Sequence, residues 1–168
     1  MEILNLVVIV LQGAAISLGM GTSTLAICNF FVAIADGKID PAERKMMGVV
    51  YTVLRVAMVL IFSTTIFLFV ASVLQNGLGL VPAFLVAQLL ITFVLFANAF
   101  LMTKRVMPSS IGPALQAGSW YTLGIMSTLV GMVGVIVSFG MFILWYCAAI
   151  VLALVTVNGA MMYLKRSK

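Results

Sequence analysis

The sequence contains no histidine, only two cysteines and few charged residues of either sign. Without histidine, the chain alone cannot supply a bis-histidine haem, a histidine-bound zinc or copper ion, or a histidine proton relay. Charged residues make up 8% of the chain, whereas soluble globular domains contain about 25%. This scarcity of charge excludes a packed, water-soluble globular domain.

Motifs for catalysis and cofactor binding are also missing. The sequence has no nucleophile–base pair, P-loop, dinucleotide fingerprint or metal-ligand cluster. We therefore expect no enzymatic activity from this chain by itself, no bound metal and no cofactor. Cys28 and Cys147 fall at different depths in the first and last apolar segments, so no disulfide is expected between them.

The sequence is instead rich in long apolar runs, and 64% of its residues are hydrophobic. About 20 apolar residues in a helix cross the ~30 Å of a bilayer core. The runs predict an all-α, single-domain bundle over residues 1–168, with five transmembrane helices near 3–35, 41–75, 81–103, 113–138 and 140–164. The first run follows no basic region and no polar cleavage region interrupts it, so we expect it to be retained rather than removed as a signal peptide.

The basic residues predict the orientation of this bundle. Five spans place the first connection, the third connection and the tail on one side, and these hold Lys38, Arg44, Lys45, Lys104, Arg105, Lys165, Arg166 and Lys168. Positive charge favours the cytoplasmic side, so the amino terminus is expected outside and the carboxyl terminus inside the cell membrane. Because the bases are dispersed at helix ends, the partner is expected to be the bilayer and not nucleic acid.

The first two predicted helices are too long for a bilayer. Runs of about 30 residues extend ~45 Å, so they must tilt, bend at a glycine or project. A projecting apolar hairpin would need another protein surface to cover it. Small residues further predict that the first and fourth helices pack closely, along Gly13, Ser17 and Gly21 on the first and Gly124, Ser127, Gly131, Gly134 and Ser138 on the fourth.

The first connection contains signals for helix ends. Gly37 is predicted to end the first helix, while Asp40 caps the second, Pro41 opens it and Glu43 completes a capping box. The same residues resemble the second half of a calcium-binding EF-hand loop. In that alternative, the first and third ligands would be Val32 and Ile34, which cannot coordinate a hard cation.

The apolar run of the second helix begins at residue 46, after its charged first turn; Arg55 is the one charge inside an apolar run, and no acid lies in any of these runs to pair with it. A charge at mid-bilayer needs a partner, a water-filled cavity or a route to the interface. The antiparallel hairpin places Arg55 opposite Thr22, Ser23 and Thr24. A polar layer of Asn29, Asn98 and Asn158 is predicted nearby, because each asparagine lies six or seven residues before a cytoplasmic charge. Three roles are open for Arg55: it binds an anion or carboxylate, it forms an ion pair with another subunit, or its side chain extends to the cytoplasmic membrane interface.

Residues 18–44, LGMGTSTLAICNFFVAIADGKIDPAER, resemble small multi-span membrane proteins of archaea and some bacteria. The chain is also similar in type to the small accessory subunits of archaeal copper membrane monooxygenases. This resemblance implies a non-catalytic subunit that packs with other integral membrane subunits into a larger complex.

Two functions are thus predicted. One is the non-catalytic subunit, favoured by the overlong apolar helices and by an arginine without an acid in its own chain. The alternative is a small channel or transporter in which Arg55, the two threonines and the three asparagines line a path for an anion.

Overall fold

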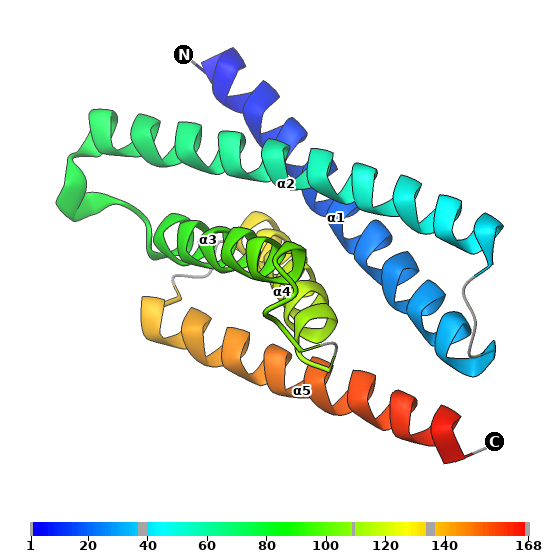
Figure 1. Cartoon of the computed structure of the whole chain (residues 1–168). Helices are drawn as coiled ribbons and strands as arrows, with labels where there is room; N and C mark the ends of the chain where they lie inside the picture. The colour runs from blue at the N-terminus through cyan, green and yellow to red at the C-terminus, as the bar shows by residue number, and fades with distance from the viewer. Residues whose placement is uncertain (1, 37–39, 109, 134–136, 167–168) are drawn as a thin grey trace.

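The computed structural model describes residues 2–36, 40–108, 110–133 and 137–166, without the side chains of residues 2, 33–36, 132, 133, 165 and 166. These residues form five α-helices and one 3₁₀ turn (Figure 1): α1 (Glu2–Asp36), α2 (Pro41–Asn76), η1 (Leu78–Leu80), α3 (Ala83–Thr103), α4 (Gly112–Val133) and α5 (Phe139–Arg166). The predicted all-helical class is therefore confirmed.

Four of the helices are long and apolar enough to cross a membrane, over Ile3–Val32, Pro41–Asn76, Ala83–Thr103 and Phe139–Leu164. The helix outside this group is α4, which contains Gln116, Ser119 and Thr122. All three side chains are buried inside the bundle. Helices α1, α3 and α5 pack around α4, so few of its side chains lie on the surface of the bundle.

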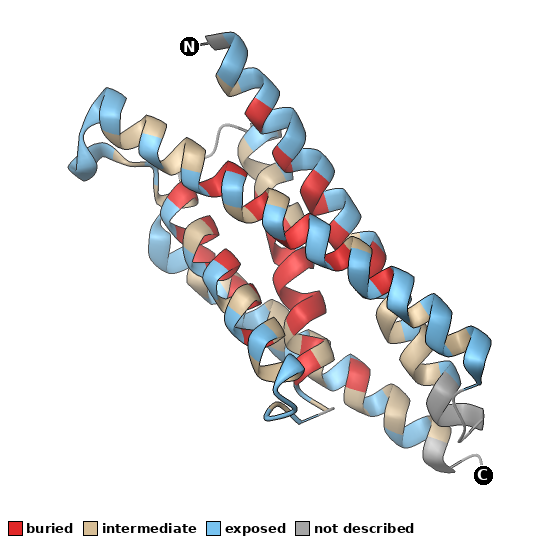
Figure 2. Cartoon of the chain, turned by 45° about the horizontal axis from the view of Figure 1, so that its top comes forward, coloured by how far each residue is buried: buried red, intermediate tan, exposed pale blue. Residues whose placement is uncertain are grey.

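Burial is concentrated on α4, which lies at the centre of the bundle (Figure 2). Its apolar side chains Trp120, Leu123 and Met126 belong to the hydrophobic core, which they form with residues of α1, α2, α3 and α5. The outer faces of the other helices expose large apolar side chains, as a surface in contact with lipid requires.

Local signals account for several helix ends. Asp40 caps α2, because its Oδ1 accepts a hydrogen bond from the backbone N–H of Glu43 at 2.7 Å, and Glu43 Oε2 accepts one from the N–H of Asp40 at 3.0 Å. Gly77 ends α2 with a φ of 81°, a left-handed value that glycine adopts without strain. Gly37, the predicted end of the first helix, lies outside the described residues.

The predicted end of the fourth helix, at residue 138, is wrong. α4 is described over Gly112–Val133, residues 134–136 lie outside the described residues, and Val137 and Ser138 stand outside any helix before α5 begins at Phe139. Ser138 precedes α5, and its carbonyl oxygen accepts hydrogen bonds from the N–H groups of Met141 and Phe142.

The helices differ greatly in length, and this difference shapes one end of the bundle. With a rise of 1.5 Å per residue, the 36 residues of α2 extend ~54 Å, whereas the 21 residues of α3 extend ~32 Å. Gln116, in the second turn of α4, contacts Met58 of α2, so residues 41–54 of α2 extend past the start of α4. Together with residues 31–36 of α1 they form what we call the projecting hairpin (Figure 1).

The glycines that allow close helix packing are partly different from those predicted. Helices α1 and α4 do pack together, but a Cβ added at Gly13, Gly21 or Gly131 would meet nothing within 4 Å. The close approach occurs at Gly19, where a Cβ would collide with the indole ring of Trp120, and at the predicted Gly124, where it would collide with the side chain of Met20. The prediction is therefore confirmed for Gly124 and wrong for Gly13, Gly21 and Gly131, because glycine spacing does not reveal which glycine faces a large side chain.

Candidate anion-binding cavity

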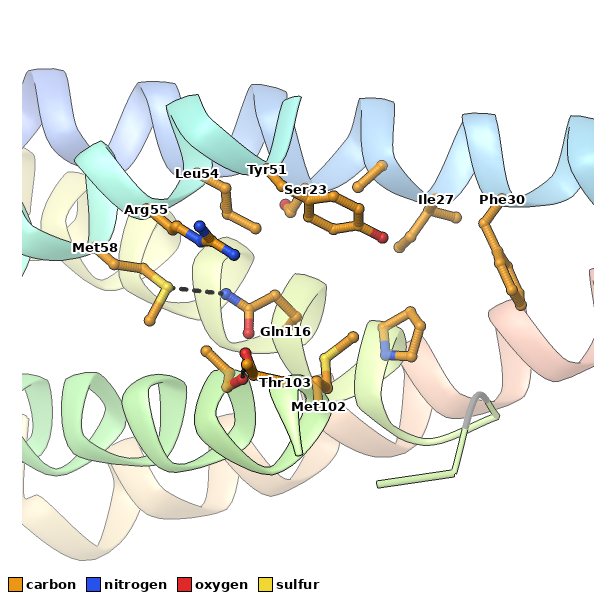
Figure 3. Close-up of a pocket in the computed structure, with 13 residues that line it drawn as sticks. Ser23, Ile27, Phe30, Tyr51, Leu54, Arg55, Met58, Met102, Thr103 and Gln116 are labelled. Carbon is orange, nitrogen blue, oxygen red and sulfur yellow. Dashed lines mark hydrogen bonds between the residues drawn. The ribbon is translucent and has the colours of Figure 1, made fainter. Parts of the chain in front are cut away.

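A cavity of about 300 Å³ lies between α1, α2, α3 and α4, at the base of the projecting hairpin. Its polar lining consists of Ser23, Tyr51, Arg55, Thr103 and Gln116, and its apolar lining of Ala26, Ile27, Phe30, Leu54, Met58, Ala99, Met102 and Pro113. We call it the Arg55 cavity. Figure 3 shows the side chains of Arg55 and Gln116 pointing toward one another across it.

Arg55 is an unpaired cation within the part of the chain that the structure describes. The side chain is exposed, and no described group forms a hydrogen bond or an ion pair with its guanidinium. The acids with described side chains, Asp40 and Glu43, cap the start of α2, 12 to 15 residues and therefore ~18–22 Å away along the helix. The five N–H groups of the guanidinium are thus free to bind a ligand.

Gln116 is held in place by Asn98 of α3. The amide nitrogen of Asn98 donates to Gln116 Oε1 at 3.1 Å and to the backbone carbonyl of Gly112 at 3.0 Å. With its oxygen occupied, Gln116 has only its Nε2 contact to Met58 Sδ at 3.8 Å. Because sulfur is a weak acceptor, the Gln116 amide N–H groups can donate to a ligand in the cavity.

The position of the cavity along the bundle explains why an arginine is tolerated there. Thr103, which lines the cavity, is the last residue of α3, and Lys104 and Arg105 follow directly. Arg55 therefore lies level with the end of α3 and not with its middle, and the ~32 Å of α3 match the thickness of a bilayer core. From Arg55 to Asn76, α2 retains ~33 Å of helix, which is enough to span the core.

Of the residues predicted to surround Arg55, Ser23 lines the cavity, whereas Thr22, Thr24 and the three asparagines do not. Thr22 donates to the Leu18 carbonyl, and Thr24 donates to the Met20 carbonyl and lies 2.7 Å from the Tyr121 hydroxyl. Ser23, between them, does line the cavity.

The three predicted asparagines are also placed outside the lining. Asn98 does not line the cavity, but its side-chain amide nitrogen donates a hydrogen bond to the lining residue Gln116. Asn158 of α5 donates to the carbonyls of Ser110 and Leu154, and so ties α5 to the connection before α4. Asn29 lies half-buried on α1, between the lining residues Ile27 and Phe30.

Three lining residues were not predicted from the sequence: Gln116, Tyr51 and Thr103. A signal for Gln116 was present, because a glutamine inside an apolar run is rarely left without a structural or functional partner. Tyr51 and Thr103 carry no such signal, since tyrosine and threonine are common near the ends of membrane helices.

The lining favours binding over chemistry. It offers one cation, hydroxyl groups and an amide, and it contains no acid. Within the described residues, no three histidine, cysteine, aspartate or glutamate side chains come together as a metal site would require.

No family model, curated protein or solved structure matches this chain. The function therefore has to be argued from the residues of the cavity and of the helices around it.

Proposed function

We propose that this chain is a multi-pass protein of the cell membrane that binds a small organic monoanion in the Arg55 cavity. The observation that carries the proposal is the unpaired guanidinium of Arg55, which points into a partly apolar cavity at the level where α3 ends. A planar guanidinium fork matches the two oxygens of a carboxylate or sulfonate head.

The rest of the lining indicates the shape of the ligand. The hydroxyl groups of Tyr51 and Thr103 and the amide of Gln116 can donate further hydrogen bonds to the anionic head. The apolar lining residues suit a compact hydrocarbon body, such as a single aromatic ring. At about 300 Å³, the cavity is at the small end of ligand-binding pockets, and its lack of acids disfavours cations.

The proposed topology has five spans, with α4 crossing inside the ring of the other helices. The basic end, which holds Arg44, Lys45, Lys104 and Arg105, faces the cytoplasm under this topology. The Arg55 cavity then opens toward the cytoplasmic side. The chain binds its ligand without converting it.

The test measures binding of benzenesulfonate and benzoate by calorimetry, with the full chain in nanodiscs of zwitterionic lipid. Arg55→Leu is expected to abolish binding, and Arg55→Lys to weaken it at least tenfold, because lysine keeps the charge but loses the two-point geometry. Charge-assisted hydrogen bonds contribute about 1.5–3 kcal/mol, which corresponds to a loss of about 10- to 150-fold.

Arg44→Leu is the matched control, because it removes an exposed arginine of the same helix outside the cavity. Undiminished binding to Arg55→Leu, or equal losses in the Arg44 and Arg55 variants, would contradict the proposal. If anionic phospholipid in the nanodisc displaces both probes, the natural ligand is a lipid head group and not a free anion.

A second candidate function, a non-catalytic subunit of a larger membrane complex, is favoured by the projecting hairpin. It extends ~20 Å beyond the level of Arg55 and exposes Val32, Met46 and Val49. Outside the bilayer core, such apolar side chains require cover from another protein. A stoichiometric second protein in native mass spectrometry of gently extracted material would support this function, and a chain extracted alone would contradict it.

A further inference from the structure

A second cavity, of about 640 Å³, opens toward the other end of the bundle. It lies between α1, α2, α4 and the start of α3, and its polar lining consists of Asn5, Gln12, Ser72, Gln75, Asn76, Ser127 and Thr128. We call it the Gln12 cavity. Its lining contains no charged residue, and the buried oxygens Asn5 Oδ1 and Ser72 Oγ have no hydrogen-bond partner.

The two cavities are connected by continuous helix faces. On α3, Leu85 lines the Gln12 cavity and Ala99 lines the Arg55 cavity. Steps of three or four residues keep a helix on one face, and such steps lead from Leu85 to Ala99 through Gln88, Thr92 and Leu95. Equivalent faces on the other helices run through Ile16, Gly19 and Ser23 of α1, Leu68, Thr65, Ile61 and Met58 of α2, and Ser127, Leu123, Trp120 and Gln116 of α4.

The stretch between the cavities contains buried polar atoms without partners. Gln88, Thr92 and Trp120 are each 0% exposed. Both amide atoms of Gln88, the hydroxyl of Thr92 and the indole nitrogen of Trp120 have no hydrogen-bond partner. We call these three residues the central polar layer.

Packing alone does not explain the central polar layer. A buried polar group without a partner costs free energy that an apolar residue of similar shape avoids. Leucine in place of Gln88 and valine in place of Thr92 would fill similar space without this cost. The three residues share one chemical property, since each carries an N–H or O–H group that can donate to an anion.

We propose that the two cavities are the two ends of one route by which the organic monoanion crosses the bundle. This inference rests on the proposed function. Donors of Gln88, Thr92 and Trp120 solvate the anion between the cavities, and the structure is the closed state. The closing group is the indole of Trp120, which fills the space against the backbone of Gly19.

The test measures passage of benzenesulfonate, which stays ionised and so does not cross as a neutral acid. Liposomes that contain the full chain are loaded with potassium benzenesulfonate. Valinomycin carries potassium across the bilayer, and the release of benzenesulfonate is followed over time. We expect release above that of protein-free liposomes. The double variant Gln88→Leu, Thr92→Val should lower it at least tenfold.

Thr156→Val is the matched control for Thr92→Val. Thr156 is exposed on α5, away from the route, and its hydroxyl donates to the Leu152 carbonyl of its own helix. Its replacement should leave release unchanged. The double variant should melt no lower than the wild type and should still bind benzenesulfonate in the Arg55 cavity, which shows that its loss of release is not a loss of fold.

Undiminished release by the double variant would overturn the route. Wild-type liposomes that release nothing, from a protein that binds benzenesulfonate at Arg55, would overturn the route and leave the proposed function intact. A wild type that neither binds nor releases the anion would refute the proposed function itself.

Discussion

The contact between Gly19 and Trp120 allows a sharp test of the packing at the bundle centre. Gly19 is buried on α1, and an added Cβ would overlap the six-membered ring of the Trp120 indole. The indole is fully buried, so its displacement would disturb the core packed around it. Gly19→Ala must displace either the ring or the α1 backbone.

Two opposing terms set the magnitude of this change. Extra methyl groups in a well-packed core cost about 1–3 kcal/mol, while alanine gains about 0.5–1 kcal/mol over glycine inside a helix. The overlap is with a rigid ring and not with the end of a flexible chain, so the first term dominates. We expect Gly19→Ala to lower the unfolding free energy by up to about 2.5 kcal/mol, the largest difference between these two ranges.

Gly21→Ala is the control, because a Cβ at Gly21 meets nothing within 4 Å. It should raise the unfolding free energy or leave it unchanged. Unfolding of the purified protein in detergent, followed by circular dichroism, measures both variants. Combining Gly19→Ala with Trp120→Leu should recover part of the loss, since neighbours that clash show coupling of about 0.5–3 kcal/mol. Equal effects of the two alanines, or no coupling, would refute the packing argument.

Much of the fold is encoded locally and could be predicted from the sequence. Apolar runs separated by polar connections indicate helices, and the all-helical class they predicted is confirmed by the structure. The end of α2 at Gly77 and the capping box of Asp40 and Glu43 depend on residues at most four positions apart. Signals of this range remain visible in a single sequence.

The position of Arg55 along the bundle, in contrast, could not be predicted from local sequence patterns. Within the sequence, Arg55 lies inside an apolar run, and an arginine there suggests a charge in the middle of the bilayer. In the structure it lies level with Thr103, because α2 is much longer than α3 and extends past it. That register depends on contacts between segments distant in sequence, such as the one between Met58 and Gln116, and no local pattern encodes it.

The residues around Arg55 illustrate the same limit. The hairpin register leads to residues 22–24, but only the direction of each side chain decides that Ser23 faces the cavity while the hydroxyls of Thr22 and Thr24 bond to their own helix. Asn98 could be identified as polar, yet its role in orienting Gln116 depends on how α3 packs on α4. Polar residues in apolar runs can thus be recognised from sequence, while their partners require the tertiary structure.

The remaining predictions concern the first connection and the orientation of the bundle. Asp40→Ala removes the cap of α2 and should cost about 1 kcal/mol of unfolding free energy. The cost should be the same with and without calcium, and a calcium-dependent melting shift of the wild type would instead support the half EF-hand. For the orientation, Pro108→Cys and Gly79→Cys place a thiol in the connections at opposite ends of the bundle, after Cys28 and Cys147 have been replaced by alanine. Both positions are exposed, so access depends on the side of the membrane and not on packing. An impermeant maleimide added to intact cells should label Gly79→Cys and spare Pro108→Cys, because position 108 follows Lys104 and Arg105, whose charge favours the cytoplasm. Labelling of Pro108→Cys alone would reverse the orientation and place the Arg55 cavity on the outer side of the membrane.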